Sequence, residues 1–300
     1  MLSFNRQRLL GFGALVVLTL IWAYNWIVMK SVLPYINAID FSSLRTLLGF
    51  FILLFILKAT GRSIKPTPFV ITVLIGFFQT TTMIGFSQLA LVVGGAGKVT
   101  IMVYTMPFWI AILSVFVLKD KLGALQIFAL IVAALGLLLI IQPWSSDNPF
   151  LSYVFALASG LCWGIGAVIT KWFYTRFAVD TLSLTTWQMG YGSVFLIIFS
   201  LASGQHNFVL DAPYLWFALF YNAALATALG WLLWMFILRT MNASVAGLCT
   251  LVIPVIAILL SWWLLNERPD NLEFVGIAFI VLGLIFINLR YSKKTAKTRN

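Results

Sequence analysis

The chain has 300 residues, of which 62% are hydrophobic and only 9% are charged. A soluble domain carries about 25% charged residues, so this composition excludes a soluble enzyme and a soluble binding module. The formal net charge of +11 is typical of nucleic-acid binders, but the basic residues lie between apolar stretches, which favours a membrane protein instead.

The apolar residues form continuous stretches that are long enough to cross a bilayer. A hydrocarbon core about 30 Å thick needs about 20 apolar residues in a helix, and the sequence contains ten such stretches. They lie near residues 9–29, 41–57, 68–90, 99–118, 122–142, 150–170, 182–203, 213–238, 244–265 and 271–289. Hydrophobicity is continuous within each stretch instead of alternating, which predicts helices and excludes the strands of a membrane barrel.

The second five stretches repeat the first five. An offset of 141 residues superimposes Trp22 on Trp163, Lys30 on Lys171 and Gly49 on Gly190. An offset of 147 residues superimposes Pro107 on Pro254, Ser114 on Ser261, Leu118 on Leu265, Asp120 on Glu267 and Gly136 on Gly283. Because each unit has an odd number of crossings, the two units must sit in the membrane with opposite orientations, as in many alternating-access transporters.

The predicted fold is therefore an all-α membrane protein with ten transmembrane helices. Two inverted five-helix repeats, residues 1–143 and 144–290, are expected to surround a central cavity. A basic tail, residues 291–300, would follow them. We expect that tail to lie on anionic lipid headgroups, where each basic residue contributes about 1 kcal/mol.

The Lys and Arg residues indicate how the chain lies in the membrane. With the N-terminus in the cytoplasm, 15 of the 19 fall on the cytoplasmic side, while Lys30, Lys98 and Arg268 fall outside and Arg45 lies within a stretch. Cytoplasmic loops are enriched in Lys and Arg, so both termini are predicted to be cytoplasmic. The count also places Lys30 outside and its equivalent Lys171 inside, as inverted repeats require.

Acidic, histidine and cysteine residues are placed unfavourably for catalysis or metal binding. All eight Asp and Glu residues fall in loops or at the ends of stretches. Proton-coupled carriers and exporters of lipophilic cations usually need a carboxylate inside the membrane, so both are disfavoured, although aromatic rings can hold a cation weakly. His206 is the single histidine, and Cys162 and Cys249 lie within stretches. These residues predict no zinc site, disulfide or Ser-His-Asp triad.

Polar and aromatic residues inside the stretches are the candidates for a solute-binding cavity. Asn and Gln are costly in lipid, so they should face the bundle interior or a water-filled space. Trp22 and Asn25 share one helix face. The alternative is hydrogen bonding between helices, worth about 0.6 kcal/mol per bond on average. The predicted cavity wall consists of Trp22, Asn25, Gln79, Tyr104, Trp163, Trp187 and Gln188.

Pro107 and Pro254 occupy equivalent positions in the fourth and ninth stretches. Proline has no N–H and clashes with the carbonyl four residues earlier, here that of Val103 or Thr250, so each helix can kink and leave that carbonyl free. A kink that serves packing alone is the simpler interpretation. The recurrence in both halves favours a pair of hinges that let helix segments swing as gates.

Arg45 is the one charged residue inside a stretch, about one turn from its outer end. Its long side chain can reach the interface, where the charge stays hydrated. As a functional residue it would instead attract a carboxylate or phosphate group that enters from outside. Both interpretations stay open at this point.

Short motifs recur in both halves. The first half contains Trp22-Ala23-Tyr24-Asn25, then Lys30 and Arg45. The second half contains Trp163-Gly164, then Lys171 and Trp187-Gln188-Met189-Gly190, with Asn266-Glu267-Arg268 after the ninth stretch. With these motifs the chain, from about residue 9 to about residue 290, resembles the ten-helix branch of the drug/metabolite transporter superfamily with two EamA-type repeats. Ala23 stands where that family usually has Gly, and Lys119-Asp120 stands where it usually has Gly-Glu.

The resemblance implies a multi-pass carrier of the bacterial inner membrane that exports amino acids or related zwitterionic metabolites through a cavity open alternately to each side. It also implies architectural roles for Lys30, Asp120, Glu267 and the two prolines. A multidrug or nucleotide-sugar carrier is the alternative within the superfamily. A membrane-embedded enzyme and a channel are alternatives outside it, and the enzyme would need buried His, Asp or Glu. We expect no cofactor, metal or nucleic acid, and the choice between monomer and homodimer stays open.

Overall fold

The computed structural model describes residues 4–117, 123–142, 144, 149–240 and 252–297, without the side chains of 4–12, 126, 284–285 and 287–297. Within these ranges the regular structure is helical, apart from one isolated bridge between Ile36 and Phe208. Five residues named above lie outside the described ranges: Leu118, Lys119, Asp120, Cys249 and Thr250. The side chains of the basic tail also lie outside them.

The helices follow the predicted stretches closely. The first half contains α1 (Phe4–Ser31), α2 (Ala38–Ala59), α3 (Phe69–Ile75), η1 (Gly76–Thr82), α4 (Met83–Val93), α5 (Ala96–Val103), α6 (Met106–Val117) and α7 (Ala124–Ile141). The second half contains α8 (Phe150–Arg176), α9 (Thr181–Ser203), α10 (Pro213–Phe220), η2 (Tyr221–Leu229), α11 (Gly230–Thr240), α13 (Val252–Leu265) and α14 (Asn271–Lys297). α14 continues as a helix into the residues that we expected to form a separate tail.

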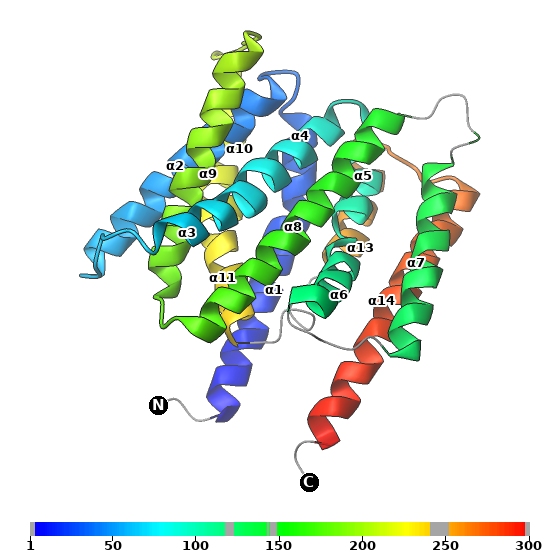
Figure 1. Ribbon diagram of the computed structural model, residues 1–300. Helices are drawn as coiled ribbons and strands as arrows, with labels where there is room; N and C mark the ends of the chain where they lie inside the picture. The colour runs from blue at the N-terminus through cyan, green and yellow to red at the C-terminus, as the bar shows by residue number, and fades with distance from the viewer. Residues whose placement is uncertain (1–3, 118–122, 143, 145–148, 241–251, 298–300) are drawn as a thin grey trace.

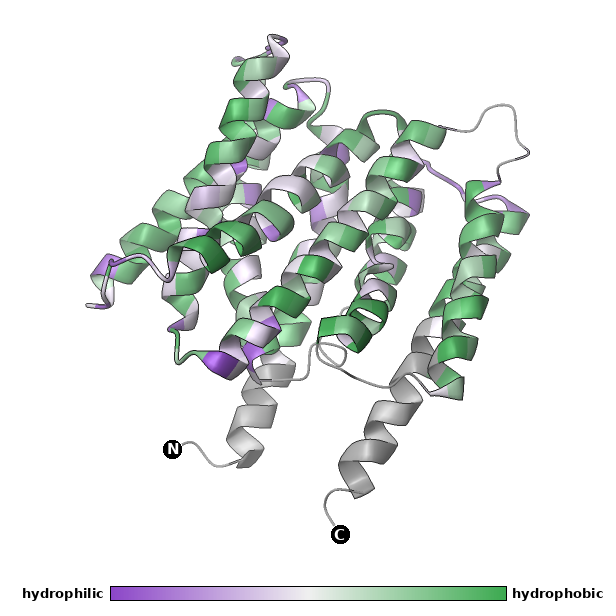
Figure 2. Cartoon of the chain, viewed as in Figure 1, coloured by the Kyte–Doolittle hydropathy of each residue, from purple (hydrophilic) through white to green (hydrophobic). Residues whose placement is uncertain are grey.

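Seven described helical segments are long and apolar enough to cross a membrane. They are Gly13–Ser31, Ala38–Ala59, Phe69–Val93, Ala96–Val117, Phe150–Arg176, Thr181–Ser203 and Pro213–Thr240. Three shorter apolar helices, Ile127–Ile141, Val252–Leu265 and Asn271–Gly283, fall below that length in the described part of the chain. The count of ten crossings therefore stays a prediction. Hydrophobic residues cover most of the helix surfaces, and the most hydrophilic residues gather mainly toward the ends and loops (Figure 2).

The helix starts have local causes in the sequence. The Asn37 side chain accepts a hydrogen bond from the backbone N–H of Ile39 at 3.0 Å and caps α2. Asp180 accepts one from the N–H of Ser183 at 2.9 Å and caps α9. Such caps satisfy N–H groups that the first helical turn leaves free. The second helix of each half therefore begins with a polar capping side chain, as many helices of soluble proteins do.

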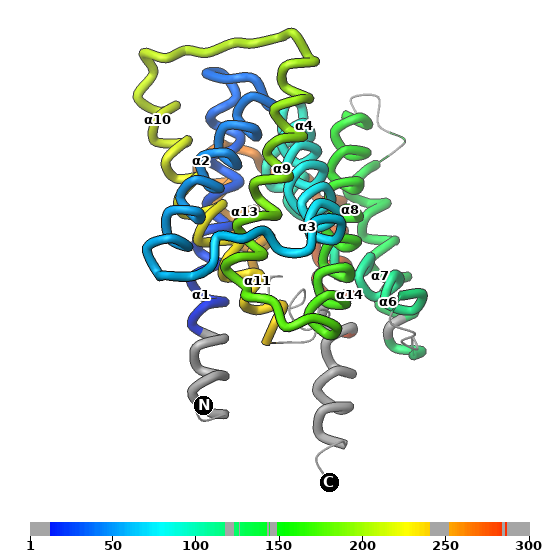
Figure 3. The backbone as a smooth tube through the Cα atoms, turned by 60° about the vertical axis from the view of Figure 1, so that its left-hand side comes forward, coloured from blue at the N-terminus to red at the C-terminus, as the bar shows by residue number. Residues whose placement is uncertain are grey.

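The two halves interlock. α1 packs mainly against α11, α13 and η2 of the second half, and α8 packs mainly against α4, α5 and α6 of the first. Equivalent helices also pair, α2 with α9 and α7 with α14. α1 and α8 run in opposite directions, and the N-terminal end of α1 lies at the same end of the molecule as the C-terminal end of α14 (Figures 1 and 3). This arrangement is consistent with the architecture of two inverted repeats.

The third helix of each half widens into a π-helical segment, η1 in one half and η2 in the other. Each segment faces the second helix of the opposite half at a glycine. Gly49 of α2 lies against Thr227 of η2, and Gly192 of α9 lies against Thr80 of η1. These matching contacts pair Gly49 with Gly192, whereas the sequence offset paired it with Gly190, which lies against Phe50. The true register differs because the offset shifts between the first and second helices of the repeat.

α7 and α14 form a pair at one edge of the molecule (Figure 1). A Cβ atom at Gly136 would lie 2.6 Å from the carbonyl oxygen of Gly276, and one at Gly276 would lie 2.7 Å from that of Gly136. Small residues of this kind let membrane helices approach closely. The pair therefore packs backbone to backbone at these two glycines.

Candidate functional site

The fourth crossing is interrupted near its middle. α5 ends at Val103, residues 104–105 form a turn, and α6 follows. Pro107 lies in the first turn of α6, where a missing N–H is tolerated. Pro254 likewise lies in the first described turn of α13. The sequence predicted a kink within one helix, but the structure ends one helix and starts another, and the turn holds Tyr104 in the buried interior.

Two glycines of α8 let that helix approach this turn. A Cβ atom at Gly160 would lie 2.7 Å from the carbonyl oxygen of Val103, and one at Gly164 would lie 2.8 Å from the Cβ of Trp109. Both distances are shorter than real Cβ atoms show. The backbone of α8 therefore packs directly on the interrupted helix, and the carbonyl that Pro107 leaves without its helical donor faces α8.

Six buried aromatic side chains meet in the centre of the molecule. They are Trp22, Trp26, Tyr104, Trp163, Trp231 and Trp234. The ring centroid of Trp163 lies 5.5 Å from that of Trp22 and 5.3 Å from that of Tyr104, both edge to face. Such pairs contribute about 0.5–1.5 kcal/mol beyond the burial of their area. We refer to these six residues as the aromatic cluster.

Half of the aromatic cluster was not among the predicted cavity residues. Trp26, Trp231 and Trp234 lie within predicted spans, where packing of the bundle explains a tryptophan as well as a cavity does. A signal was available for Trp26, because it lies one residue after Asn25 and four after Trp22. The two tryptophans of α11 have no comparable sequence neighbour, and only the fold brings them to the centre.

A small cavity of about 30 Å³ lies within the aromatic cluster. This volume is about that of one water molecule in the liquid. The central cavity is therefore too small for a solute, and we call this arrangement the closed conformation. Both halves contribute to its wall, which includes Trp22, Asn25, Arg45, Tyr104, Trp163 and Trp231. None of its described lining residues is Asp or Glu.

Arg45 is buried at the edge of this central cavity and is only 5% exposed. Its Nη1 donates a hydrogen bond to Oδ1 of Asn222 in η2 at 2.5 Å, and its guanidinium carbon lies 5.9 Å from the ring centroid of Phe41. Its Nε has no hydrogen-bond partner among the described residues. The interfacial interpretation of Arg45 is therefore wrong, because α2 packs against η2 and turns this side chain inward. Among the described residues, no carboxylate forms an ion pair with it.

Two further polar atoms at the central cavity lack a partner within the described ranges: Oδ1 of Asn25 and Nε1 of Trp163. The amide nitrogen of Asn25 contacts only the sulfur of Met29, at 3.0 Å. Trp22, the equivalent of Trp163, instead donates its indole N–H to the carbonyl of Ala226 at 2.9 Å. An unsatisfied buried group costs about 1–3 kcal/mol, so these atoms are available to a ligand or to water.

Gln79, Trp187 and Gln188 lie apart from the central cavity, around the contact between α9 and η1. Nε2 of Gln79 lies 3.5 Å from Oγ1 of Thr170, and the Trp187 ring lies 6.0 Å from that of Phe50. Gln188 is fully buried, and neither of its amide atoms has a partner in the described part of the chain. The structure brings together four of the seven predicted cavity residues: Trp22, Asn25, Tyr104 and Trp163.

Gln188 and Arg45 occupy equivalent positions in the two halves. Each lies one helical turn before the glycine that faces a π-helical segment, Gly192 in α9 and Gly49 in α2. One half therefore places a neutral amide where the other places a guanidinium. The polar sites beside the two π-helical segments are related by the repeat but differ by one charge.

Lys30 and Lys171 close the C-terminal ends of two helices. Nζ of Lys30 donates to the carbonyls of Leu91 and Gly94 at 2.7 and 3.0 Å, at the end of α4. Nζ of Lys171 donates to the carbonyl of Leu238 at 3.1 Å, near the end of α11. A cation is favourable there because the helix dipole places partial negative charge at that end. The two lysines make equivalent bonds in the two halves, which is an architectural role.

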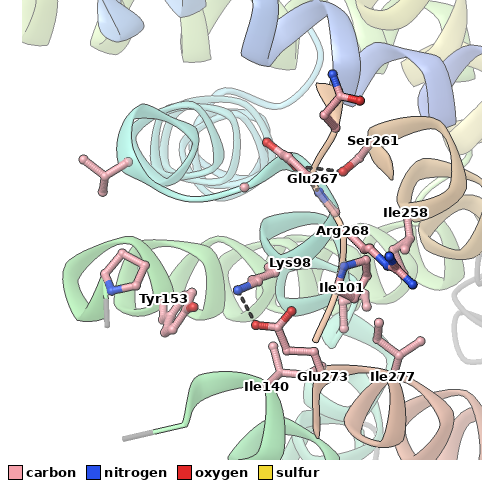
Figure 4. A pocket seen from close by; sticks show the side chains of 16 residues that line it. Lys98, Ile101, Ile140, Tyr153, Ile258, Ser261, Glu267, Arg268, Glu273 and Ile277 are labelled. Carbon is pink, nitrogen blue, oxygen red and sulfur yellow. Dashed lines mark hydrogen bonds and ion pairs between the residues drawn. The ribbon is translucent and has the colours of Figure 1, made fainter. Parts of the chain in front are cut away.

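A larger cavity of about 440 Å³, the outer cavity, lies where α5, α13 and α14 meet (Figure 4). Lys98 forms an ion pair there with the buried carboxylate of Glu273. Glu273 and Asp270 also cap α14 reciprocally through backbone N–H bonds of 3.0 and 2.8 Å. Burial alone would raise the pKa of Asp270, but hydrogen bonds from the Glu273 backbone and the Gln142 amide, together with Lys98, lower that pKa below its ordinary value.

The other charged groups of the outer cavity also have partners. Glu267 accepts hydrogen bonds from Oγ of Ser261 at 2.7 Å and from the backbone N–H of Gly97 at 3.4 Å, at the start of α5. A carboxylate is favourable at a helix N-terminus. The guanidinium of Arg268 lies 5.6 Å from the ring centroid of Trp262. The sequence indicated Glu267 as a motif residue but gave no sign of a cavity beside it.

A narrow space of about 10 Å³ lies between the two cavities. It shares Ile101, Ile258 and Ile277 with the outer cavity and Tyr104 with the central cavity. The aliphatic residues and the ring of Tyr104 therefore separate the two spaces in the closed conformation.

Comparison with known proteins shows similarity over nearly the whole chain. A model described as the EamA-like transporter family matches residues 9–142 and 150–289. The uncharacterized transporter YoaV of Bacillus subtilis (strain 168) is 26% identical over 289 residues, which cover 93% of this chain and 97% of that one. A protein of Escherichia coli (strain K12) described as a probable amino-acid metabolite efflux pump is 25% identical, over 92% of this chain and 94% of its own. A solved crystal structure superimposes with a TM-score of 0.70 at 18% identity, covering 96% of this chain and 98% of the other, so the two share a fold.

Proposed function

Because the chain belongs to the EamA-like transporter family of the drug/metabolite transporter superfamily, and is thus a membrane transporter, we propose that it exports small zwitterionic metabolites by alternating access. Amino acids are the first candidates, since one relative is described as a probable amino-acid metabolite efflux pump. The names of the family and of its relatives indicate transporters and not enzymes.

The proposal includes the membrane arrangement. Residues 1–143 and 144–290 form the two inverted repeats, each with five crossings, and the protein lies in the bacterial inner membrane with both termini in the cytoplasm. The asymmetry of Lys and Arg residues supports this orientation. The basic tail, residues 291–300, contacts anionic lipid on the cytoplasmic side.

The central cavity is the observation that carries the proposal. Helices of both halves enclose it, it holds a set of aromatic rings, and no carboxylate is among its described lining residues. Aromatic faces attract the ammonium group of a zwitterion by cation–π interaction and accept an apolar side chain. An N–H donor of Trp163 and an oxygen acceptor of Asn25, both without partners among the described residues, supply hydrogen bonds for its polar end.

Transport requires the cavity to grow, because about 30 Å³ admits no solute larger than water. The turn at residues 104–105 is the place where this growth can begin, since it separates two rigid helices and carries Tyr104 into the cavity. Pro107 and Pro254 fix the starts of the helices that move, and they act as the paired hinges. Movement at Tyr104 would also open the narrow space that leads to the outer cavity.

Counterflow in proteoliposomes tests this function. Vesicles loaded with one unlabelled solute are given traces of labelled solute outside, with the twenty amino acids, nucleosides and lipophilic cations as the panel. We expect neutral amino acids to drive labelled uptake by exchange, as a carrier requires. A channel would show no stimulation from the opposite side. Exchange of lipophilic cations with no response to any amino acid would overturn the proposal in favour of a multidrug carrier.

A further inference from the structure

Arg45 is a buried cation whose charge no described carboxylate balances. Its one side-chain hydrogen bond goes to the neutral amide of Asn222, and its Nε points to no partner within the described ranges. Placing an uncompensated charge in the interior of a protein is costly. Charged residues inside the membrane-spanning part of a protein pair with one another or with backbone carbonyls, and they mark substrate and ion pathways.

The pseudo-symmetric half shows that the fold itself does not require this charge. Gln188 occupies the equivalent position in α9, one turn before the glycine that faces a π-helical segment. α9 packs against η1 there as α2 packs against η2 at Arg45. A shorter, neutral side chain is therefore compatible with the equivalent helix packing, and the guanidinium at position 45 needs a separate explanation.

The central cavity contains hydrogen-bond donors that suit an anionic group. Arg45 and Trp163 line the same central cavity, and each has an N–H group without a partner among the described residues. A guanidinium and a neighbouring N–H make short, charge-assisted hydrogen bonds to a carboxylate. The outer cavity offers no such pair, because its cations already contact Glu273 and the ring of Trp262.

We propose that Arg45 and the indole N–H of Trp163 form a subsite for the carboxylate of the transported solute, with Oδ1 of Asn25 on the same wall to accept a hydrogen bond from its ammonium group. The assignment of the solute as an α-amino acid rests on the proposed function, whereas the carboxylate requirement does not. The site then accepts solutes with an acidic group and repels lipophilic cations.

Three probes that share a phenyl group separate these requirements. Phenylalanine carries both charged groups, 3-phenylpropionate carries only the carboxylate, and phenethylamine carries only the ammonium. Binding to the purified full chain is followed by the fluorescence of its tryptophans, several of which lie in the aromatic cluster. We expect phenylalanine and 3-phenylpropionate to bind, and phenethylamine to bind about 10- to 100-fold more weakly than either.

Arg45→Gln is the matched variant, because it places at position 45 the residue that the other half already uses. We expect it to weaken phenylalanine and 3-phenylpropionate by about 10- to 100-fold and to leave phenethylamine unchanged or slightly tighter. Arg45→Lys keeps the charge and should retain part of the affinity. Arg62→Gln is the control, because the Arg62 side chain is half exposed and lies in a loop. The Arg62→Gln protein should bind all three probes as the wild type does.

The outcomes separate the subsite from the proposed function. Equal binding of 3-phenylpropionate and phenethylamine by the wild type would overturn the subsite without any variant, even if Arg45→Gln failed to fold. Unchanged affinities in a folded Arg45→Gln protein would overturn it as well. Binding of 3-phenylpropionate that depends on Arg45, with no binding or exchange of any amino acid, would keep the subsite and reject the amino-acid function.

Discussion

The outer cavity and the central cavity differ in how their polar groups are paired, and their volumes do not reveal this difference. The outer cavity measures about 440 Å³ and the central cavity about 30 Å³, so of these two cavities the outer one has more room for a ligand. The charged groups of the outer cavity are paired with one another, with helix ends or with an aromatic ring. The central cavity instead holds a buried guanidinium and two further polar groups that lack partners among the described residues.

The unpartnered polar groups therefore favour the central cavity over the outer cavity as the solute site. A closed carrier has little space where its solute binds, since the walls come together once the solute has left. The polar groups that serve the solute remain there and keep no partner of their own. Charges that hold helices together are already paired, as Lys98 and Glu273 are.

Trp163→Ala should have the largest effect, because Trp163 lines the central cavity, its ring contacts several rings of the aromatic cluster, and its N–H has no partner among the described residues. We expect transport to be abolished while the protein still reaches the membrane. Unchanged efflux would remove Trp163 from the site. Trp263→Ala is the matched control, since that ring is 77% exposed on α13.

Truncation of a buried tryptophan also costs about 3–5 kcal/mol of stability, so a milder variant accompanies it. Trp163→Phe keeps a ring in the aromatic cluster and removes the indole N–H. Transport by this variant should fall while its melting temperature changes less than that of Trp163→Ala. Full activity in Trp163→Phe would show that the N–H serves no solute.

Gly160→Val tests whether the interrupted helix must stay in contact with α8. The new side chain would collide with the carbonyl of Val103, 2.7 Å from its Cβ, and such overpacking costs about 1–3 kcal/mol. We expect transport to fall sharply, because the turn that carries Tyr104 is displaced, and the melting temperature to fall with it. Gly13→Val is the control, since a Cβ atom there meets nothing within 4 Å. Normal transport by Gly160→Val would show that transport does not depend on the contact between α8 and the turn at residues 104–105.

Lys98→Gln tests whether the charged groups of the outer cavity stabilise the fold or bind the solute. The variant leaves the buried Glu273 without its ion pair, so we expect a loss of about 1–3 kcal/mol in the free energy of unfolding. The affinity for solute should stay within about twofold of the wild type, in contrast to Arg45→Gln. A loss of affinity without a loss of stability would make the outer cavity a solute site.

Arg62→Ala should have the smallest effect. Arg62 forms an ion pair with Asp180 in which both side chains are well exposed, and exposed pairs contribute about 0–1 kcal/mol. Thermal unfolding and counterflow should both match the wild type within error. A loss of transport would indicate that the loops between α2 and α3 and between α8 and α9 act as a gate.

Much of the fold could be predicted from the sequence, because the bilayer imposes helices of a set length. The equivalent roles of Lys30 and Lys171 also follow from their spacing, and the structure shows the same bond in each half. The turn at residues 104–105 was expected only as a kink, since a proline marks a weak point in a helix without fixing how the helix breaks. The π-helical segments were not predicted, because continuous hydrophobicity predicts a helix without fixing its hydrogen-bond pattern.

The candidate site was harder to predict. Trp22, Asn25, Tyr104 and Trp163 meet as expected, but Gln188 lies beside η1 although its polarity suggested the same cavity. Adjacent residues in a helix face different sides, so the side that a polar residue faces depends on the neighbouring helices. Arg45 shows this dependence most clearly. Its position in the sequence allowed its side chain to face either the membrane interface or the protein interior, and the packing of α2 on η2 places it in the interior.

A structure determined with phenylalanine bound at saturation tests the central claim most directly. We predict density for the amino acid within the aromatic cluster, with its carboxylate between Arg45 and the indole nitrogen of Trp163 and with the cavity enlarged by movement at Tyr104. Density for the amino acid between Lys98 and Glu267 in the outer cavity, with the central cavity still closed, would contradict the account.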